Sequence, residues 1–379
     1  MTRKLYLMFV LLFVHCGFHN CYLADQSEEQ ENDQLIFAHV IYRHGDRSPN
    51  KSYPNDPYSS EHLWPDGWGQ LTKRGMQRQY QLGKYLRKRY YKLLVDGKYT
   101  SDKVYIRSSD YDRCILSANA NLLGFFPTGN DEVWADKIKC RPIPVHTVPR
   151  ELDHIVALER HCARYDKAYK ETFESPEFLA ARNKAERYIK LIMDNSGIEN
   201  ITTMDIISVW DTLRVQYLEN LTLPSWTEDM MNPGSDMDIY IRCFYKMFTY
   251  TTEMKKLKAG FLLKEILYRC TEKTQSKLSP DRSLWIYSGH DITIANLLNS
   301  LGLYDGYIPP FASCLFFELY QSGKDNFNVQ LFYKNTTVED LPPLNPLNIP
   351  GCGTKCPLDQ FKRLFKDVLP IQNFETECN

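Results

Sequence analysis

The sequence predicts an α/β fold in which a mixed, mostly parallel sheet has helices on both faces and a smaller helical domain is inserted into it. Strand-like apolar runs alternate with helically periodic segments in both outer parts of the chain. The stretch between them is helical in composition, with few β-branched runs. The 379 residues are 43% apolar, enough for a large core. We therefore expect an α/β domain formed by residues 33–150 and 271–379, with a helical insertion at 151–270.

The first half of the chain supplies two strand and helix pairs. An apolar run at 35–42 predicts a buried strand, and a loop rich in Pro, Tyr and Trp follows at 50–69. Apolar residues at helical spacing then predict a helix at 71–94, whose basic face we interpret as solvated rather than as a nucleic-acid surface. A second strand is expected at 103–106. Residues 108–110 offer an N-cap to the helix after it.

The second half returns to the α/β pattern after the insertion. An extended element is expected at 142–149, before the helical stretch begins. A strand pattern resumes at 283–287 and passes into a helix at 292–303. Two final runs, 314–320 and 327–333, surround Ser-Gly-Lys and predict a hairpin.

The N-terminus has the layout of a cleaved export signal, which we place at residues 1–24. Arg3 and Lys4 precede an apolar segment at 5–14, and a looser stretch follows. That segment is shorter than the ~20 residues needed to cross a bilayer, and no later segment is long and apolar enough. We expect a mature protein outside the cytosol, with no membrane span.

The charge balance limits the possible partners. The chain has 46 basic and 47 acidic residues and a formal net charge of −1, so it lacks the global cationic field of nucleic-acid binders. No nucleic-acid partner is expected, and any recognition of anions must be local.

Residues able to hold and attack a phosphate follow three of the predicted strands. Arg43, His44 and Arg47 follow the first strand, Arg107 follows the second, and His290 and Asp291 follow the third. Ligands of open α/β sheets bind beyond the carboxyl ends of the strands, so we expect these side chains to converge. Guanidinium groups bind phosphate oxygens through paired hydrogen bonds, and histidine can act as a nucleophile.

The predicted chemistry is attack by His44 on phosphorus, with Asp291 as the proton donor to the leaving alcohol. Surrounding guanidiniums should lower the pKa of His44 and keep it neutral in acid. A helix N-terminus favours the ionised form of Asp291, whereas desolvation and bound phosphate favour the protonated form, so we expect an acidic activity optimum. Gly45 would let the ligand approach the backbone. Asp46 either orients His44, which we favour, or pairs with Arg47 or caps a turn.

No catalytic metal and no cofactor are expected. His39 is interpreted as a packed core residue, one strand face away from the cluster. The remaining central histidines lack ligand-like spacing, and no HExxH motif is present. These residues are His146, His154 and His161.

The cysteines and sequons fit an oxidising compartment. Eleven cysteines less Cys16 and Cys21 of the signal leave nine, an odd number, so at least one thiol is free or bonded to another chain. Cys352 and Cys356 form a local disulfide or half of a zinc site, and we favour the disulfide. Glycosylation is expected at three sequons, and a fourth, at Asn50, is expected to stay unoccupied beside the catalytic motif. The three are Asn200, Asn220 and Asn335.

Arg-His-Gly-Asp-Arg-Ser-Pro at 43–49, together with His290-Asp291, resembles the paired signature of the histidine acid phosphatases, and the chain looks most like their prostatic and lysosomal types. The likeness runs from about 35 to 378. It includes the segments 69–72, 104–108, 142–149, 223–226 and 352–356.

The resemblance implies a phosphoglycerate-mutase-like fold and a phosphomonoesterase that is often a homodimer. It gives His44 the role of nucleophile and Asp291 that of proton donor. It implies phosphate binding by Arg43, Arg47, Arg107 and His290, and it implies the disulfides Cys162–Cys378 and Cys352–Cys356. The usual partner of Cys314 would fall in 215–220, which holds no cysteine. Cys314 is therefore reduced or bonded elsewhere, for example to Cys243.

These observations predict a phosphatase that is secreted or resident in the lysosomal lumen and hydrolyses small phosphate monoesters through a phosphohistidine. The first alternative is an inositol-phosphate hydrolase, disfavoured because only Lys51 adds local positive charge. The second is a non-catalytic secreted protein that binds phosphorylated ligands. A phosphate transferase or mutase is disfavoured by the export signal.

Overall fold

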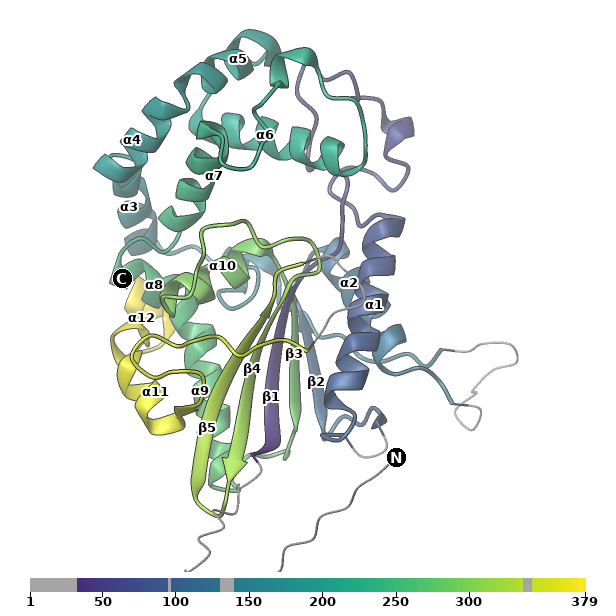
Figure 1. The fold of residues 1–379 in the computed structure, drawn as a ribbon, viewed down its shortest axis with the longest axis vertical. Coiled ribbons are helices and arrows are strands. Elements are labelled where there is room, and N and C mark those ends of the chain that lie inside the picture. The colour runs from purple at the N-terminus through teal and green to yellow at the C-terminus, as the bar shows by residue number, and fades with distance from the viewer. Residues whose placement is uncertain (1–32, 95–96, 130–139, 337–342) are drawn as a thin grey trace, which may run out of the picture. The chain divides into compact units, whose positions relative to one another are not determined.

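A six-stranded mixed sheet organises the part of the chain that the structure describes (Figure 1). This computed structural model describes residues 33–94, 97–129, 140–336 and 343–379, so the expected signal peptide at 1–24 lies outside it. The strands lie in the order β2-β3-β1-β4-β5-β6. Their bounds are β1 Gln34–Arg43, β2 Val104–Ser108, β3 Leu284–Gly289, β4 Cys314–Ser322, β5 Asn326–Lys334 and β6 Cys356–Pro357.

The strand pairings confirm a mixed sheet, in which parallel pairing is limited to β1, β2 and β3. β3 pairs in parallel with both β1 and β2, with Arg43 opposite Gly289 and Ser108 opposite Ser288. The other three pairs, β1 with β4, β4 with β5 and β5 with β6, are antiparallel. Parallel pairing is therefore less extensive than predicted, because the expected hairpin at the C-terminal side joins β1 in the antiparallel direction. The parallel strands end together, which places residues 44, 109 and 290 at one edge.

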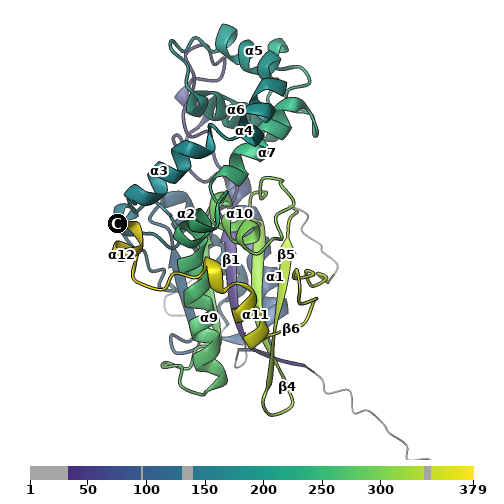
Figure 2. The same cartoon turned by 90° about the vertical axis from the view of Figure 1, so that its left-hand side faces the viewer.

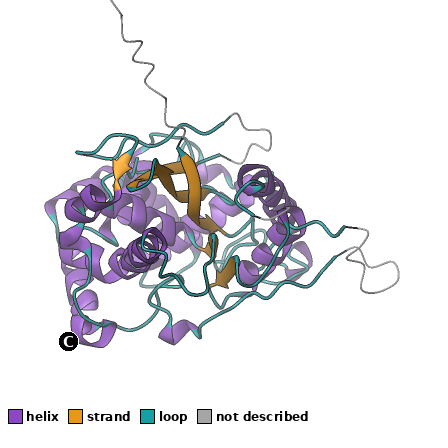
Figure 3. Ribbon diagram, turned by 90° about the horizontal axis from the view of Figure 1, so that it is seen from below, coloured by secondary structure: helices purple, strands orange, loops and turns teal. Residues whose placement is uncertain are grey.

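Helices cover both faces of the sheet, as Figures 2 and 3 show. On one face lie α1 (Lys73–Tyr90) and α2 (Asp112–Phe125), whose apolar stripes share a core with β1, β2 and β3. The predicted stripe of α1 is buried at Leu82, Leu86 and Tyr90. The N-cap of α1 is Thr72, whose side chain accepts a hydrogen bond from the Gly75 N–H.

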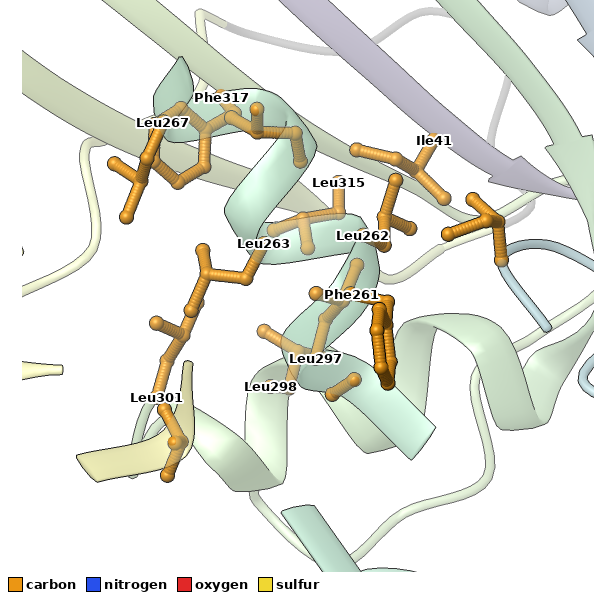
Figure 4. Close-up of a cluster of buried hydrophobic side chains, with 14 of the residues drawn as sticks. Ile41, Phe261, Leu262, Leu263, Leu267, Leu297, Leu298, Leu301, Leu315 and Phe317 are labelled. Carbon is orange, nitrogen blue, oxygen red and sulfur yellow. The ribbon is translucent and has the colours of Figure 1, made fainter. Parts of the chain in front are cut away.

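On the other face, α9 (Phe261–Thr274) and α10 (Asp291–Ser300) pack against β1, β3 and β4. Figure 4 shows this core, where Leu263 and Phe261 of α9 meet Leu297 of α10 and Leu315 of β4. The smaller elements on this side include α8 Thr252–Lys255, the π-helix η6 Lys256–Gly260, α11 Leu358–Leu364, η7 Lys366–Val368 and α12 Phe374–Cys378. Because α9 completes the core of the sheet, it does not pack as part of a separate helical domain.

The central helices build a second apolar core of their own. Its buried residues lie between Phe178 and Met247 in the sequence, and Tyr53, from the loop after β1, packs with them. The helices of this part are α3 Ala163–Thr172, α4 Pro176–Lys184, α5 Glu186–Ser196, α6 Thr203–Leu218 and α7 Asp236–Met247. Three short 3-10 turns complete the described elements, η1 Glu61–Leu63, η4 Arg150–Leu152 and η5 Ser225–Thr227. Residues 33–379 form one compact unit, and the division at 151 and 270 stays a prediction.

Two disulfides close the C-terminal part of the chain. They join Cys162 to Cys378 and Cys352 to Cys356, the two pairs that the resemblance implied. Cys314 carries a buried free thiol, and so does Cys243, so the two are not bonded to each other. No helix among the described residues is long and apolar enough to cross a membrane.

Candidate active site

The ends of β1 and β3 bring the two catalytic candidates together. His44 directly follows β1, and its backbone N–H donates to the Gly289 carbonyl of β3 at 2.9 Å. His290 directly follows β3, and its ring centroid lies 5.7 Å from that of His44, edge to face. The convergence expected at this edge is therefore present for these two imidazoles.

A cavity of about 350 Å³ opens at this edge. It combines cationic, imidazole and carboxylate groups near the strand ends with an apolar wall contributed by α6. Its lining comprises His44, Arg47, Asn50, Tyr111, Arg113, Ala157, Glu159, Met204, Ile207, Ser208, Trp210, Asp211, Tyr245, His290, Asp291 and Ile292.

His44 is held as a neutral imidazole with one free nitrogen. Its Nδ1 lies 2.8 Å from the Gly45 carbonyl oxygen, which only accepts hydrogen bonds, so Nδ1 carries the proton and Nε2 keeps its lone pair. Burial and the positive charges of Arg113 and Arg43 lower the pKa of His44 well below its ordinary value. The ring therefore stays unprotonated in mild acid, as a nucleophile requires.

His290 is fixed at the start of α10. Its Nε2 lies 2.9 Å from Ser109 Oγ, and its backbone N–H donates to Thr293 Oγ1 at 3.1 Å. Burial and the charge of Arg113 lower the pKa of His290 to about 3. This imidazole is thus neutral and supplies hydrogen bonding rather than charge.

Asp291 is the first residue of α10 and one of the acids on the cavity wall. Its Oδ2 pairs with Arg43 at 2.8 Å and accepts from Tyr245 Oη at 3.1 Å, while Oδ1 accepts from the Ile292 N–H at 2.8 Å. Burial alone would raise the pKa of Asp291, but the charges of Arg43 and Arg47 outweigh it and lower the pKa below the ordinary value. Of the two opposing effects expected at Asp291, the one favouring ionisation prevails without ligand.

Arg43 and Arg47 hold different positions. Arg43 is fully buried beneath the cavity wall, where it donates to the Pro309 carbonyl at 2.7 Å and lies 4.0 Å above the Phe311 ring. Arg47 lines the cavity, and its Nη2 donates to both carboxylate oxygens of Asp211 of α6, at 2.8 and 3.0 Å. Helix α6 therefore supplies the counterion of Arg47, one of the residues expected to bind phosphate.

Arg107 does not lie on the cavity wall, and Arg113 does. The guanidinium of Arg107 pairs with the buried Asp153 at 2.7 Å. Arg113, in the first turn of α2, lines the cavity and has no ion pair with an acid of the described residues. Burial lowers the pKa of Arg113, although a guanidinium remains charged. We therefore assign to Arg113 the place that the sequence reasoning gave to Arg107.

Gly45 and Asp46 serve the packing of α1 rather than the ligand. A Cβ on Gly45 would lie 2.3 Å from the Gly75 carbonyl oxygen of α1, so only glycine fits this close approach. The buried Asp46 carboxylate pairs with Arg78 of α1 at 2.7 Å. Neither His44 nor Arg47 is its partner, so the alternatives weighed for Asp46 are replaced by this pair.

Other expected features are placed as follows. His39 is fully buried in β1, with neither ring nitrogen hydrogen-bonded. The four sequon residues Asn50, Asn200, Asn220 and Asn335 are exposed, and Asn50 also lines the cavity. The described residues hold no group of three or more His, Cys, Asp or Glu side chains able to bind a metal ion.

Four site residues were missed by the sequence reasoning: Arg113, Asp211, Tyr245 and Phe311. The spacing of Arg113 offered a signal, because a residue in the first turn of a helix after a strand points toward the strand ends. Asp211 and Tyr245 lie in the helical part, far along the sequence, and no local pattern marks them.

Comparison with known proteins identifies the family. A model of the histidine phosphatase superfamily (branch 2) matches residues 34–334. Prostatic acid phosphatase of Rattus norvegicus is 38% identical over 352 residues, covering 91% of this chain and 89% of its own. Lysosomal acid phosphatase of Homo sapiens is 37% identical over 347 residues, covering 91% and 80%.

A solved structure supports the same fold. The phytase of Hafnia alvei in complex with tartrate superposes with a TM-score of 0.66 at 17% identity, covering 92% of this chain and 98% of its own. The expected resemblance is confirmed, and the chain belongs to branch 2 of the histidine phosphatase superfamily.

Proposed function

We propose that the protein is an acid phosphatase that hydrolyses phosphate monoesters through a phosphohistidine at His44. The observation that carries the proposal is the free Nε2 of a neutral His44 on the wall of a cavity that also holds Arg47, Arg113 and Asp291. Relatives that match 91% of the chain are named prostatic and lysosomal acid phosphatases, which supports a phosphoric monoester hydrolase.

The reaction proceeds in two displacements. His44 Nε2 forms a bond to phosphorus while the bond from phosphorus to the ester oxygen breaks, and Asp291 gives its proton to the departing alcohol. Water then attacks the phosphohistidine and returns a proton to Asp291, which releases inorganic phosphate and restores His44. The proton stays on Nδ1 throughout, and its hydrogen bond to the Gly45 carbonyl oxygen holds the ring in orientation.

The phosphate is bound by groups at three strand ends. Arg47, Arg113 and His290 line the cavity and contact the phosphate oxygens directly. Arg43 contributes positive charge from beneath the wall through its pair with Asp291. Arg107 acts indirectly, since its guanidinium is bound to Asp153.

An acidic optimum follows from the proton that Asp291 must supply. The arginines lower the pKa of Asp291 in the empty site, so its proton arrives with the substrate or is taken up when phosphate neutralises those arginines. Low ambient pH favours both routes, and the lowered pKa of His44 keeps the nucleophile neutral under the same conditions.

The relatives' names also bear on location. We propose that the mature chain, without residues 1–24, is secreted or resident in the lysosomal lumen, and that small phosphate monoesters are its substrates. A homodimer is proposed from the resemblance alone.

Replacement of His44 tests this function directly. His44→Ala should lower kcat for 4-nitrophenyl phosphate by at least about 10⁴-fold at acidic pH, because no other nucleophile takes its place. His161→Ala is the control, since the side chain of His161 is 81% exposed and pairs only with Asp166. Turnover by His44→Ala equal to that of the control would refute the proposal.

A further inference from the structure

We propose that Glu159 selects against substrates whose leaving group carries additional negative charge, so that the enzyme favours monoesters with an apolar leaving group. The inference rests on the proposed phosphatase activity and gives it a substrate class. It follows from the position of Glu159, from the wall opposite, and from the loop that fixes the carboxylate.

Glu159 lies one tyrosine ring outward from the phosphate-binding groups. Tyr111 Oη donates to Glu159 Oε1 at 2.5 Å. The Tyr111 ring meets the His290 ring edge to face at 5.2 Å, and the Arg113 guanidinium lies 4.3 Å above it. A leaving group attached to a phosphate bound at His290 therefore extends past Tyr111 toward Glu159.

The acids on the cavity wall differ in their partners, because Asp211 and Asp291 pair with arginines whereas Glu159 bonds to Tyr111. The wall cations, Arg47 and Arg113, lie beside the phosphate position, and the wall residue beyond Tyr111 is the acid Glu159. Arg150 lies 4.7 Å from the Tyr111 ring, hydrogen-bonds Tyr111 and interacts with Glu159 from the solvent side, but it is not part of the wall. A second phosphate on the leaving group would thus meet a carboxylate instead of a guanidinium.

The wall contributed by α6 is mainly apolar. Met204, Ile207 and Trp210 line the cavity at helical spacing, and Met204 is 54% exposed although its side chain is large and apolar. These three side chains gain free energy by covering an aryl or alkyl group, and the polar residues that α6 adds to the wall are Ser208 and the acid Asp211, neither of which carries a positive charge for a polyanion. The wall and Glu159 therefore favour the same kind of leaving group.

The loop that carries Glu159 is fixed by a buried carboxylate. Asp153 accepts backbone hydrogen bonds from three successive N–H groups at 2.9 to 3.1 Å, those of Ile155, Val156 and Ala157. Its Oδ1 also pairs with Arg107 at 2.7 Å, and the Glu159 N–H donates to the Asp153 carbonyl at 3.0 Å.

The end of the loop is constrained as well. Leu158 adopts a left-handed conformation, with φ of 62°, and its carbonyl accepts from Lys258 Nζ at 2.6 Å. A non-glycine residue keeps this conformation only where its surroundings hold it. Arg107 is thus a positioning residue for the backbone of this loop, and Glu159 is an exposed carboxylate on the cavity wall whose side chain is held by Tyr111.

The test compares two substrates in matched variants of the full mature chain. 4-Nitrophenyl phosphate carries one phosphate on an aryl group, and myo-inositol hexakisphosphate is a polyanion. Glu159→Gln should raise the ratio of kcat/KM for the polyanion to kcat/KM for the aryl ester by about tenfold. Glu174→Gln, the same charge change at an exposed residue outside the cavity, should leave that ratio within about twofold of the wild type.

Salt supplies a readout that a merely structural role of Glu159 would not move. The advantage of Glu159→Gln for the polyanion should shrink when the ionic strength rises from about 0.02 M to about 0.5 M, because screening removes the repulsion in the wild type. An unchanged ratio in Glu159→Gln, or an advantage independent of salt, would overturn the inference. The absence of turnover of both substrates by the wild type would instead overturn the proposed function.

Discussion

At the scale of single residues, one cluster of guanidiniums sets the protonation of both catalytic groups. Burial and positive charge act together on His44, so its pKa falls well below the ordinary value. On Asp291 they act in opposition, and the charges of Arg43 and Arg47 prevail. The site therefore holds a neutral nucleophile together with an ionised acid, and a bound phosphate must bring or induce the proton that Asp291 donates.

Arg113 and Arg107 should respond differently to substitution. Arg113→Ala should lower kcat/KM for 4-nitrophenyl phosphate by about 10²- to 10³-fold, because a phosphate-binding guanidinium without an acidic partner is lost. Arg107→Ala should change the inhibition constant of inorganic phosphate by less than about threefold. The reason is that the Arg107 guanidinium pairs with Asp153 and does not line the cavity. Steady-state kinetics with phosphate as inhibitor distinguish the two, and a larger loss in Arg107→Ala would contradict the assignment.

Asp291→Asn should reveal the proton donor through the leaving group. The variant should lose about 10²- to 10⁴-fold in kcat for an alkyl phosphate, whose alcohol must be protonated, and much less for 4-nitrophenyl phosphate, whose phenolate departs unaided. Comparing the two substrates at one pH checks this. Equal losses on both would show that Asp291 acts only through the charge of Arg43.

The sequence predicted the residues that follow β1 and β3 directly, and it missed those that depend on distant segments. His44, His290 and Asp291 could be placed because parallel strands end at one edge. Arg107 was chosen over Arg113 because it adjoins the strand, whereas the first turn of α2 carries Arg113 back toward the cavity. No local pattern could show that Asp153, in another segment, binds Arg107.

At the scale of elements, β1 carries a buried titratable group that links stability to pH. His39 is fully buried with no hydrogen-bond partner, and burial and the charge of Arg269 lower its pKa well below 6.5. The unfolded chain binds a proton below about pH 6.5 that the native chain does not. The contribution of His39 to the free energy of unfolding is therefore fully present above about pH 6.5. It is lost as the pH falls below that value.

Replacing His39 should reduce that dependence. Between about pH 7.5 and about pH 5.5, His39→Leu should lose about 1 kcal/mol less of its free energy of unfolding than the wild type. Urea titrations at the two pH values measure this difference, and His161→Gln at an exposed site is the control. Equal losses in His39→Leu and the wild type would contradict the argument.

Element positions could be predicted where apolar periodicity is strong. The strands expected at 35–42 and 283–287 and the hairpin of β4 and β5 were found within a few residues. The start of α2 was not, because Ser109 binds His290 and Ser288 instead of capping the helix, which begins at Asp112. The short β6 lacks any pattern, since only two residues pair with β5.

At the scale of the whole molecule, the helical character of the central stretch could be predicted from composition, but the packing of its helices could not. α9 begins at Phe261, inside the range 151–270, and ends at Thr274, and its apolar face completes the core beneath β1 and β4. An amphipathic pattern shows that a helix buries one face and does not show against which neighbour. For the same reason, the sequence pattern did not show that α6 places Asp211 beside Arg47 as its counterion.

The glycan pattern should follow the position of the cavity. Asn200, Asn220 and Asn335 are exposed and should be occupied in protein secreted from animal cells, whereas Asn50 lines the cavity and should be bare. Glycopeptide mapping of the active protein answers this for all four sequons. A fully active protein carrying a glycan at Asn50 would contradict the placement of the substrate entrance.

The most direct test of the account is to trap and locate the phosphoryl intermediate. Asp291→Asn mixed with radiolabelled 4-nitrophenyl phosphate and quenched within milliseconds should carry label that is stable to alkali and labile to acid, and peptide mapping should place it on His44. In the His44→Ala variant the label should be absent. Label on any other residue, or turnover with a burst of nitrophenol but no labelled histidine, would contradict the mechanism.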